Sequence, residues 1–399
     1  MLIKVKSITY TGLVPMEVDV EINVANRGMP GFDIIGLPNK AVEESKDRVR
    51  TAINNSGIQF PARKITINLA PGDVPKEGSF YDLPIAFGIL SSVLDIKIPE
   101  NSLFFGELSL DGSLRHTKGS LLMALFAKEK GYKKIFVPKL SANEASILEE
   151  VEVYGVPSLR SLLNHFQNDE RLEVFKYKEL KKEEEYIEFD MSEIVGQRSV
   201  KRAVEIASAG GHNILMVGPP GTGKTMLARA LPGILPRLNK KESLEVTKLY
   251  SVAGHISPGS SLVKIRPFRS PHHTVSRVGL IGGGTRPKPG EISLAHNGVL
   301  FLDELNEFPR NILESLRQPL EDGYITISRS REQTDYPAGF MLVASANPCP
   351  CGYLNHSTNP CNCTPREIEK YKKRVSGPIL DRIDIHIDVP EVPIDKLTN

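Results

Sequence analysis

Several short apolar runs in this chain end abruptly in polar or charged residues. Three of them span residues 213–217, 299–302 and 341–346. Apolar runs of this length, bounded by polar residues, are typical of strands buried on both faces of a parallel sheet. The carboxyl ends of such strands form the edge where α/β proteins bind ligands. We therefore predict a parallel α/β domain whose functional residues follow these three strands.

The first part of the chain also alternates strand-like and helix-like segments. Residues 64–69 and 134–138 are predicted strands, and residues 83–94 are a predicted buried helix. We expect Ser141 to begin a further helix and Glu144 to complete a capping box with it. This alternation predicts a second α/β domain.

A change of composition marks the boundary between the two predicted domains. Residues 178–185 are almost entirely charged, which is typical of a solvated linker. We therefore expect a first domain over residues 1–166, a linker over 167–189 and a second domain over 190–399. The length of 399 residues is sufficient for two domains.

Composition sets limits on the cellular setting. Apolar residues make up 40% of the chain and charged residues 25%, as in ordinary globular proteins, and the net charge of +2 indicates no particular partner. No apolar run is long enough to span a bilayer. Residues 1–6 resemble a first strand rather than a secretory signal. We expect a cytoplasmic protein that does not contact membranes.

A glycine-rich loop follows the first apolar run and matches the phosphate-binding pattern G-x-x-x-x-G-K-[ST]. Its residues are Gly218, Pro219, Pro220, Gly221, Thr222, Gly223, Lys224 and Thr225. Between a buried strand and a helix, such a loop surrounds phosphates with backbone N–H groups, and the helix N-terminus favours the anion. Lys224 is expected to reach the β- and γ-phosphates of ATP, and Thr225 to bind Mg²⁺.

Polar residues also end the other two runs. Asp303 and Glu304 follow residues 299–302, and Asn347 follows residues 341–346. We expect Asp303 to hold Mg²⁺, Glu304 to polarise the attacking water and Asn347 to contact that water or the γ-phosphate. Alone, each pattern is weak, because strands often end in acids and Asn often caps turns. Together with the glycine-rich loop they predict an ATP hydrolysis site.

The order of these motifs resembles that of AAA+ ATPases. The stretch around Ile194, Val195 and Gly196 resembles the segment that lies against adenine in that family. Residues 377–384 resemble the segment that carries an arginine finger in the magnesium-chelatase-like branch, which implies that Arg382 completes the site of a neighbouring subunit. Such a finger implies a homo-oligomeric ring, most often a hexamer. The alternative is that Arg382 pairs with Asp381 or Asp384.

A basic insertion separates the two phosphate-site motifs. Residues 246–290 contain seven Lys or Arg residues and no Asp or Glu, which suits contact with a nucleic-acid backbone. A solvated insertion with scattered cations is an equal alternative. A β-hairpin is also predicted from residues 324–328 and 336–343. The candidate DNA contacts are Arg266, Arg269 and Arg277 in the insertion, with Arg329 and Arg331 at the hairpin tip.

All four cysteines lie within one short segment. Cys349, Cys351, Cys361 and Cys363 form two C-x-C pairs, and four thiolates can close a tetrahedral Zn²⁺ site. His356 is a less favoured substitute ligand. The alternative is a group of reduced free thiols. Since four thiolates leave no open coordination position, the zinc would be structural.

Residues 267–274 and 290–304 closely resemble magnesium-chelatase-like proteins, and residues 69–86 and 106–112 resemble the Lon-protease-like domain that opens ComM/YifB proteins. The resemblance implies a Lon-protease-like (ribosomal S5 domain 2-like) α/β domain followed by a P-loop AAA+ α/β domain. Phe80 and Leu122 stand in the slots of the Lon catalytic serine and lysine, which predicts an inactive front domain. A helical lid with a sensor 2 arginine is expected in such proteins, and the chain ends at Asn399 before one.

The resemblance implies a ring-forming, ATP-dependent DNA motor, of the kind that drives branch migration of single-stranded or branched DNA during transformation and recombination. One alternative is a chelatase-type motor that acts on a protein partner during Mg²⁺ insertion into a porphyrin. A second, disfavoured alternative is a Ser–Lys peptidase that uses Ser79 and Lys118. The expected cofactors are ATP, Mg²⁺ and a structural Zn²⁺.

Overall fold

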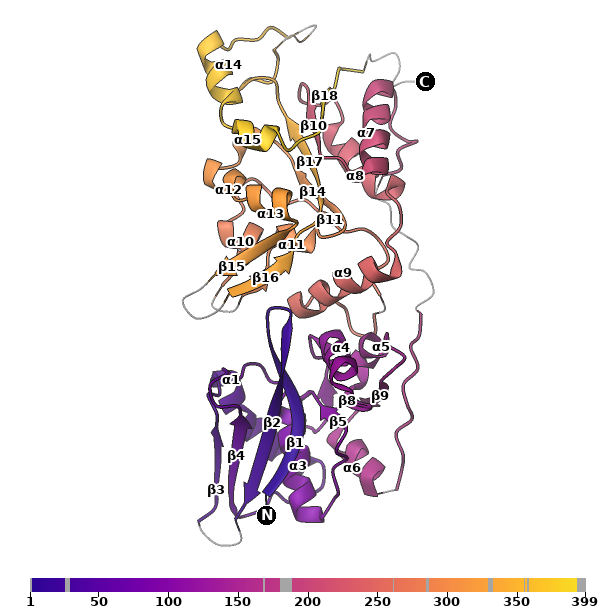
Figure 1. Ribbon diagram of the computed structural model, residues 1–399, viewed down its shortest axis with the longest axis vertical. Helices are drawn as coiled ribbons and strands as arrows, with labels where there is room; N and C mark the ends of the chain where they lie inside the picture. Colours follow the sequence, from indigo (N-terminus) through magenta and orange to yellow (C-terminus); the bar gives the residue numbers. More distant parts are fainter. Residues whose placement is uncertain are drawn as a thin grey trace. The chain divides into compact units, whose positions relative to one another are not determined.

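The computed structural model describes residues 2–25, 29–167, 169–179, 189–260, 262–284, 287–328, 333–354, 356 and 359–392. The chain divides into two compact units, drawn in Figure 1 from indigo to yellow along the sequence. Unit 1 comprises Met1–Lys181 and Tyr250–Leu262, and unit 2 comprises Lys182–Leu249 and Val263–Asn399. The segment 250–262 was expected in the ATPase domain and instead belongs to unit 1. Across the described ranges, no helix combines the length and apolarity needed to cross a membrane.

Unit 1 contains a four-stranded mixed sheet and a three-stranded parallel sheet. The first has the order β1-β2-β4-β3, with β1 (Leu2–Thr11), β2 (Val14–Val24), β4 (Lys64–Ala70) and β3 (Gly31–Ile35). The second has the order β5-β8-β9, with β5 (Ser102–Phe104), β8 (Lys134–Pro138) and β9 (Glu152–Val156). A short hairpin joins β6 (Glu107–Leu108) to β7 (Leu114–Arg115). The predicted strands 64–69 and 134–138 are therefore confirmed.

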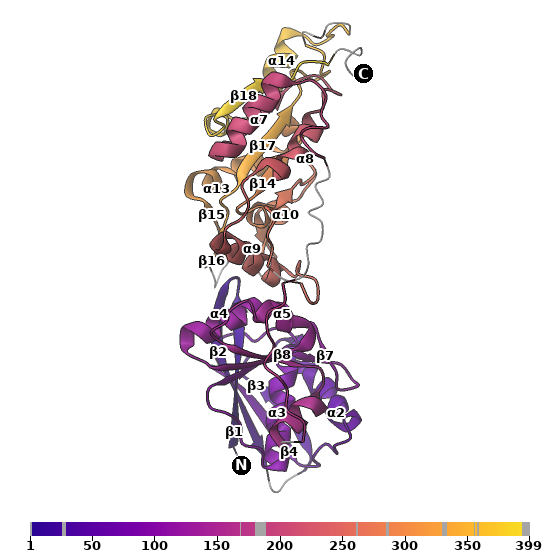
Figure 2. The same cartoon turned by 90° about the vertical axis from the view of Figure 1, so that its right-hand side faces the viewer.

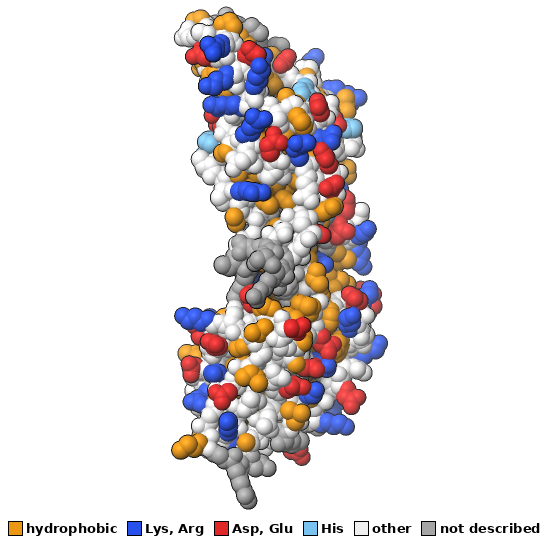
Figure 3. All heavy atoms as spheres, turned by 60° about the vertical axis from the view of Figure 1, so that its left-hand side comes forward, with side chains coloured by type: hydrophobic (Ala, Val, Ile, Leu, Met, Phe, Trp, Pro, Cys, Tyr) orange, Lys and Arg blue, Asp and Glu red, His pale blue; other side chains and the backbone are white. Residues whose placement is uncertain are grey.

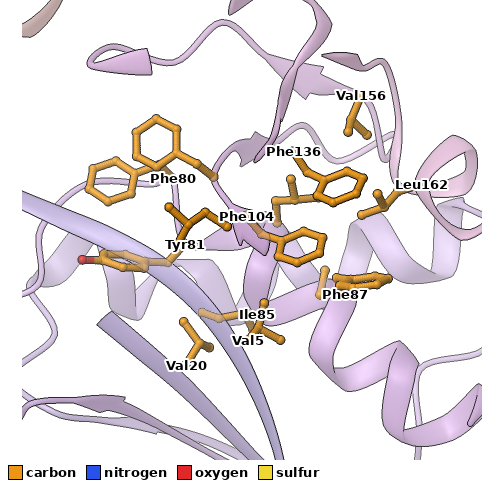
Figure 4. Close-up of a cluster of buried hydrophobic side chains, with 14 of the residues drawn as sticks. Val5, Val20, Phe80, Tyr81, Ile85, Phe87, Phe104, Phe136, Val156 and Leu162 are labelled. Carbon is orange, nitrogen blue, oxygen red and sulfur yellow. The ribbon is translucent and has the colours of Figure 1, made fainter. Parts of the chain in front are cut away.

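The helices of unit 1 close the core against these sheets. They are α1 (Lys40–Glu43), α2 (Ser45–Asn55), α3 (Asp82–Leu94), α4 (Ser120–Lys130), α5 (Ala142–Ala145) and α6 (Leu159–Gln167). The predicted buried helix corresponds to α3, whose residues 82–91 are all buried. A helix that is apolar on all sides is stable only inside a core. Figure 4 shows Ile85 and Phe87 of α3 between sheet residues such as Val5 and Phe104.

The predicted capping box at Ser141 and Glu144 is wrong, because tertiary contacts take both side chains. The hydroxyl of Ser141 accepts a hydrogen bond from the backbone N–H of Thr117 at 3.0 Å and makes no cap contact. The carboxylate of Glu144 accepts hydrogen bonds from the backbone N–H of Leu121, at 2.9 Å, and from the hydroxyl of Ser251. Ser251 belongs to the segment that follows the ATPase motif in sequence but packs in unit 1.

Unit 2 is built on a parallel five-stranded sheet of order β11-β14-β17-β10-β18. These strands are β11 (Phe268–Arg269), β14 (Val299–Leu302), β17 (Met341–Ala346), β10 (Ile214–Val217) and β18 (Ile385–Asp388). The three predicted apolar strands are thus adjacent and parallel, and β14 and β17 are fully buried. The mixed α/β architecture expected from the sequence is confirmed.

Helices surround this sheet. Helix α7 (Arg198–Gly210) packs beside α8 (Lys224–Ile234), as Figures 1 and 2 both show. The others are α9 (Lys240–Ala253), whose residues from Tyr250 onward belong to unit 1, α10 (Arg277–Ile281), α11 (Glu291–Leu294), α12 (Arg310–Glu314), α13 (Arg317–Asp322), α14 (Pro365–Lys372) and α15 (Gly377–Leu380).

Two small hairpins complete unit 2. Strand β12 (Gly282–Gly283) pairs with β13 (Lys288–Pro289), and β15 (Tyr324–Ser328) pairs with β16 (Gln333–Pro337). The second hairpin confirms the predicted one, but its partner strand lies at 333–337. Residues 341–343, which had been included in that partner, belong to the central sheet as part of β17. Strand β17 lies between β14 and β10, and all six of its side chains are buried, as in a central strand and not in a surface hairpin.

Candidate functional site

The P-loop connects β10 to α8 at the carboxyl edge of the central sheet. Gly221 and Gly223 adopt left-handed conformations with φ of +81° and +85°, which glycine adopts without steric cost. Gly218 lies so close to residue 389 that an added Cβ would be 2.3 Å from the carbonyl oxygen of Val389. The pattern predicted from sequence therefore has the strand–loop–helix context that phosphate binding requires.

Lys224 is buried beneath this loop and points its amine at loop carbonyls. Its Nζ donates hydrogen bonds to the carbonyl oxygens of Gly218 and Pro219, both at 2.7 Å, and the residue is only 8% exposed. Burial lowers the pKa of Lys224, while the nearby charges of Asp303 and Glu304 oppose that shift. A phosphate would supply the compensating negative charge that this partly desolvated ammonium lacks.

Oxygen ligands suited to Mg²⁺ meet at the ends of β14 and α8. The hydroxyl of Thr225 donates to Asp303 Oδ2 at 2.9 Å, and the hydroxyl of Ser345 donates to Asp303 Oδ1. Hydroxyl and carboxylate oxygens are the ligands that Mg²⁺ prefers. The donor set predicted from sequence, Thr225 and Asp303, is therefore brought together, and its chemistry fits the ion. Ser345 was not predicted from the sequence, because a serine inside a buried strand does not indicate which acidic residue it will contact.

Glu304 follows Asp303 in a strained backbone conformation. Its φ is +53°, which is uncommon for a residue with a side chain and is found most often at functional sites. Its backbone N–H donates to Ser345 Oγ at 3.1 Å, so the same serine contacts the carboxylate of Asp303 and the backbone of Glu304. Nδ1 of His273 lies 3.9 Å from Glu304 Oε2. No sequence pattern indicated this contact, because the two residues lie far apart along the chain.

Asn347 lies beside the P-loop. It directly follows β17, whose last residue Ala346 pairs with Val217, and the N–H of Gly218 donates to the Ala346 carbonyl at 3.1 Å. Pairing of adjacent parallel strands therefore places the amide next to the first glycine of the loop. This is the position expected for a residue that contacts a γ-phosphate or its attacking water.

The segment around Ile194, Val195 and Gly196 lies against the P-loop. The side-chain amide of Gln197 donates to the carbonyl of Thr222 at 3.3 Å and to that of Pro390 at 2.6 Å. Its Oε1 is buried and has no hydrogen-bond partner among the described residues. Ile194 is buried, whereas Val195 is 44% exposed. The segment that the sequence predicts to lie against adenine is therefore joined to the P-loop through Gln197.

Arg382 lies at the opposite edge of the same sheet. Its carbonyl accepts a hydrogen bond from the Asn213 side chain at 2.8 Å, and Asn213 precedes β10, whereas the P-loop follows β10. The strand separates the two by about 3.3 Å per residue, or roughly 15 Å. The guanidinium group pairs with Glu321 at 2.7 Å, not with either of the two acids considered from the sequence. Arg382 is therefore exposed and remote from its own chain's P-loop.

Two of the arginines predicted to contact DNA instead hold the insertion in place. Arg266 pairs with Glu242 at 3.2 Å and donates to two backbone carbonyls, and its side chain is 17% exposed. Arg269 binds Glu291 through two hydrogen bonds of 2.6 and 2.7 Å. Both acids lie just outside the acid-free window 246–290. The charge asymmetry of the window is thus partly neutralised by its flanks.

Arg277 begins α10 and is exposed. Arg329 and Arg331 lie outside the described residues. On the face drawn in Figure 3, basic and acidic side chains are interspersed over the described surface.

The four cysteines converge as predicted. All four Sγ atoms lie within 4.8 Å of one another, and three of the separations are 3.4, 3.5 and 3.7 Å. Ligands 2.3 Å from a tetrahedral zinc ion are about 3.8 Å apart, so the thiols fit such an ion. A hydrogen bond from the backbone of Tyr353 lowers the pKa of Cys351, whereas the pKa values of Cys361 and Cys363 are raised by burial and by hydrogen bonds among the thiols. His356 pairs with Glu391 and accepts a hydrogen bond from Asn359, so it is not part of the set.

Unit 1 does not assemble a Ser–Lys pair. The hydroxyl of Ser79 donates to Glu107, and the side chain of Lys118 packs against Gly254. Phe80 stacks on Phe105, with ring centroids 4.5 Å apart (Figure 4 shows Phe80 and its aromatic neighbours). The ring of Phe80, the residue expected from the resemblance to replace the Lon serine, therefore contributes to the core.

Comparisons with known proteins agree with these features. The family described as "Magnesium chelatase, subunit ChlI" matches residues 190–397, and the family "Subunit ChlI of Mg-chelatase" matches residues 20–141. The chain is 45% identical to the Haemophilus influenzae "Competence protein ComM" over 390 residues, which cover 96% of this chain and 75% of the relative.

Other relatives extend the comparison. The Escherichia coli "Uncharacterized protein YifB" is 44% identical over 382 residues, covering 95% of this chain and 74% of the relative. The "Magnesium-chelatase 38 kDa subunit" of Cereibacter sphaeroides is 27% identical over 176 residues, covering 40% of this chain and 53% of the relative. With its P-loop, its parallel five-stranded sheet and a match along both units, the chain belongs to the ComM/YifB family of magnesium-chelatase-like AAA+ proteins.

Proposed function

We propose that this chain is a ring-forming ATPase that couples ATP hydrolysis to movement along single-stranded or branched DNA. The observation that carries the ATPase part is the meeting of Lys224, Asp303 and Glu304 at one edge of the central sheet. The DNA part is supported by the 45% identity to a protein named for competence. A cytoplasmic location accords with both.

The residues of the site would act together on the γ-phosphate. Lys224 neutralises phosphate charge, and the P-loop backbone donates hydrogen bonds to it. Mg²⁺, held by Thr225 and Asp303, would neutralise charge that develops between the β- and γ-phosphates. Glu304 polarises the attacking water, and Asn347 orients it. The rate gain comes from positioning and charge stabilisation, since phosphoryl transfer needs little covalent help.

A neighbouring subunit would supply the final cation. Arg382 is exposed and lies across the sheet from its own P-loop, so it suits the site of an adjacent chain in a ring. Its partner Glu321 is half-exposed, and an exposed ion pair contributes little free energy, about 0–1 kcal/mol. Release of Arg382 toward a phosphate is therefore inexpensive. A hexamer is the ring that the family resemblance favours.

The test is steady-state ATP hydrolysis with and without single-stranded DNA and forked DNA. We expect marked stimulation by DNA in the wild type. The Lys224→Ala variant should lose essentially all turnover at every DNA concentration, because the phosphate then lacks its buried cation. Retained turnover in this variant would refute the site.

Hydrolysis that is indifferent to DNA would favour the alternative of a chelatase-type motor with a protein partner. The limited match to a magnesium-chelatase subunit is the observation behind that alternative. Ser79→Ala is the control variant for the disfavoured hypothesis of a Ser–Lys peptidase, and we expect it to leave ATP hydrolysis unchanged. Four thiols at tetrahedral spacing also support a bound zinc ion, which would be structural.

A further inference from the structure

The cysteine segment touches the nucleotide site at the P-loop. Gly352 directly follows Cys351 and has a φ of +82°. A Cβ built on Gly352 would lie 2.8 Å from Cδ of Pro220 and 4.0 Å from Cγ of Asn347. The turn that carries the first cysteine pair is therefore packed against both the phosphate loop and the polar residue at the end of β17.

A second connection runs through the residues after β18. His356, which lies between the two cysteine pairs and is 8% exposed in its side chain, pairs with Glu391. The neighbouring carbonyl of Pro390 accepts the hydrogen bond from Gln197, and the carbonyl of Val389 abuts Gly218. Residues 389–392 thus form a strap that contacts the cysteine segment, the P-loop and the segment expected to lie against adenine.

The cysteine segment has little structure of its own to hold this geometry. Between β17 and α14 the described residues form turns and bends without a helix or strand. Cys349 is fully buried, while the other three cysteines are partly exposed. A single ion bound by all four thiolates would join the backbone at Cys349 and Cys351 to that at Cys361 and Cys363. Metal ligation is the usual means by which short loops without a hydrophobic core become rigid.

We propose that a divalent ion with zinc's coordination preference, bound by the four cysteines, fixes the turn at Gly352 and the strap at Glu391, so that nucleotide affinity depends on this metal. The proposal rests on the proposed ATP site and adds a regulatory metal to it. Metal binding and nucleotide binding are coupled through this contact. When the cysteine segment is no longer fixed by the ion, Pro220 and Asn347 lose their packing against Gly352. The ion takes no part in hydrolysis, because four thiolates saturate it.

The first experiment measures zinc content and nucleotide affinity on the same full-length protein. Zinc is determined after reconstitution with zinc chloride and gel filtration, and affinity is obtained from titration with a fluorescent ATP analogue. We expect about one zinc ion per chain. Stripping the ion with a chelator should weaken nucleotide binding by about tenfold, a usual size for the coupling between two linked binding sites. Added zinc should restore the affinity.

Two variants separate the metal from its contact with the P-loop. Cys361→Ser should lose the ion and the affinity together, and Asn362→Ala, an exposed neighbour in the same loop, should lose neither. Gly352→Ala should keep the ion but bind nucleotide more weakly, because its methyl group displaces Pro220. Gly323→Ala is the matched control, since Gly323 also has positive φ, +71°, but an added Cβ would meet no atom within 4 Å.

Three outcomes decide the matter. No retained zinc after reconstitution would overturn the metal site. Retained zinc, with equal nucleotide affinity in stripped protein and in Gly352→Ala, would overturn the coupling. A wild type that holds zinc but binds no nucleotide would overturn both the coupling and the proposed ATPase. In that case Lys224→Ala would have the same zinc content and the same lack of nucleotide binding as the wild type. If the proposed ATP site is correct, Lys224→Ala should retain zinc and lose nucleotide affinity.

Discussion

At the scale of single residues, the main feature of both units is that polar side chains are oriented by partners distant in sequence. The hydroxyl of Ser345 donates to the carboxylate of Asp303 and accepts a hydrogen bond from the backbone N–H of Glu304. In unit 1, Ser251 similarly donates to the buried Glu144. Buried polar groups require such partners because an unsatisfied one costs about 1–3 kcal/mol.

Glu144 offers a residue-scale prediction of pH dependence. Burial raises its pKa, despite hydrogen bonds from Ser251 and the backbone of Leu121, and its Oε2 has no hydrogen-bond partner among the described residues. A carboxyl group whose pKa is higher in the folded state than in the unfolded state stabilises the fold at pH values below its unfolded pKa. This contribution to the free energy of unfolding is lost as the pH rises through the folded pKa. We expect Glu144→Gln to remove this loss.

The measurement is thermal unfolding of wild type and Glu144→Gln from pH 5 to pH 8. The difference in Tm, variant minus wild type, should increase with pH. Glu149→Gln, a nearby exposed glutamate, is the control and should follow the wild type. A Tm difference that stays constant across this range would contradict the assignment.

At the scale of elements, the site depends on which strand ends are neighbours. β10, β14 and β17 are adjacent in the parallel sheet, so the residues that follow each strand meet at one edge. The insertion between the P-loop and β14 is held by ion pairs from Arg266 and Arg269 to acids at its two flanks. Arg277 on α10 is exposed and remains the described candidate of this group for contact with DNA.

A comparison of Arg266→Ala with Arg277→Ala tests this division of roles. Arg266→Ala should lower stability by roughly 1–3 kcal/mol, because it leaves Glu242 and two carbonyls without their partner. Arg277→Ala should leave stability unchanged and reduce the slope of log affinity for DNA against log salt by about one. Denaturant unfolding and salt-dependent DNA binding are the measurements. Equal effects of the two variants on stability would contradict the prediction.

At the scale of the whole molecule, the proposal is that each site is completed by a second chain. Arg382 and Lys224 lie on opposite edges of one sheet, so a single chain cannot bring both to one phosphate. In a ring, the edge that carries Arg382 in one copy would face the edge that carries the P-loop in the next copy. Repeated head-to-tail contacts of this kind close into a ring when the rotation permits.

Mixing two inactive variants tests the ring. We expect Arg382→Ala and Lys224→Ala each to lack turnover, and an equimolar mixture to regain a part of it. In mixed rings some sites combine an intact Lys224 with an intact Arg382 from the neighbour. Arg317→Ala, which removes another exposed arginine of unit 2, is the control and should hydrolyse ATP as the wild type does. A mixture that stays inactive while its rings assemble would place the finger elsewhere.

Sequence alone determined the local parts of this protein. The strand–loop–helix at the P-loop, the acids after β14 and the cysteine spacing are patterns within short windows, and their chemistry follows from residue type and distance along the chain. The strand at 64–69 and the helix at 83–94 were likewise predictable, because the apolar period is a local property.

Only the tertiary structure decided which side chains share a partner. In the folded chain Glu144 accepts a hydrogen bond from Ser251 and does not cap a helix. Arg266 and Arg269 form ion pairs with flanking acids, and Gly352 packs against Pro220. The members of these pairs lie from 22 to 132 residues apart in the sequence, so no local pattern encodes them. A buried polar group needs a hydrogen-bond partner within the fold. Its partner is therefore a group that lies near it in space, whether or not that group is near in sequence.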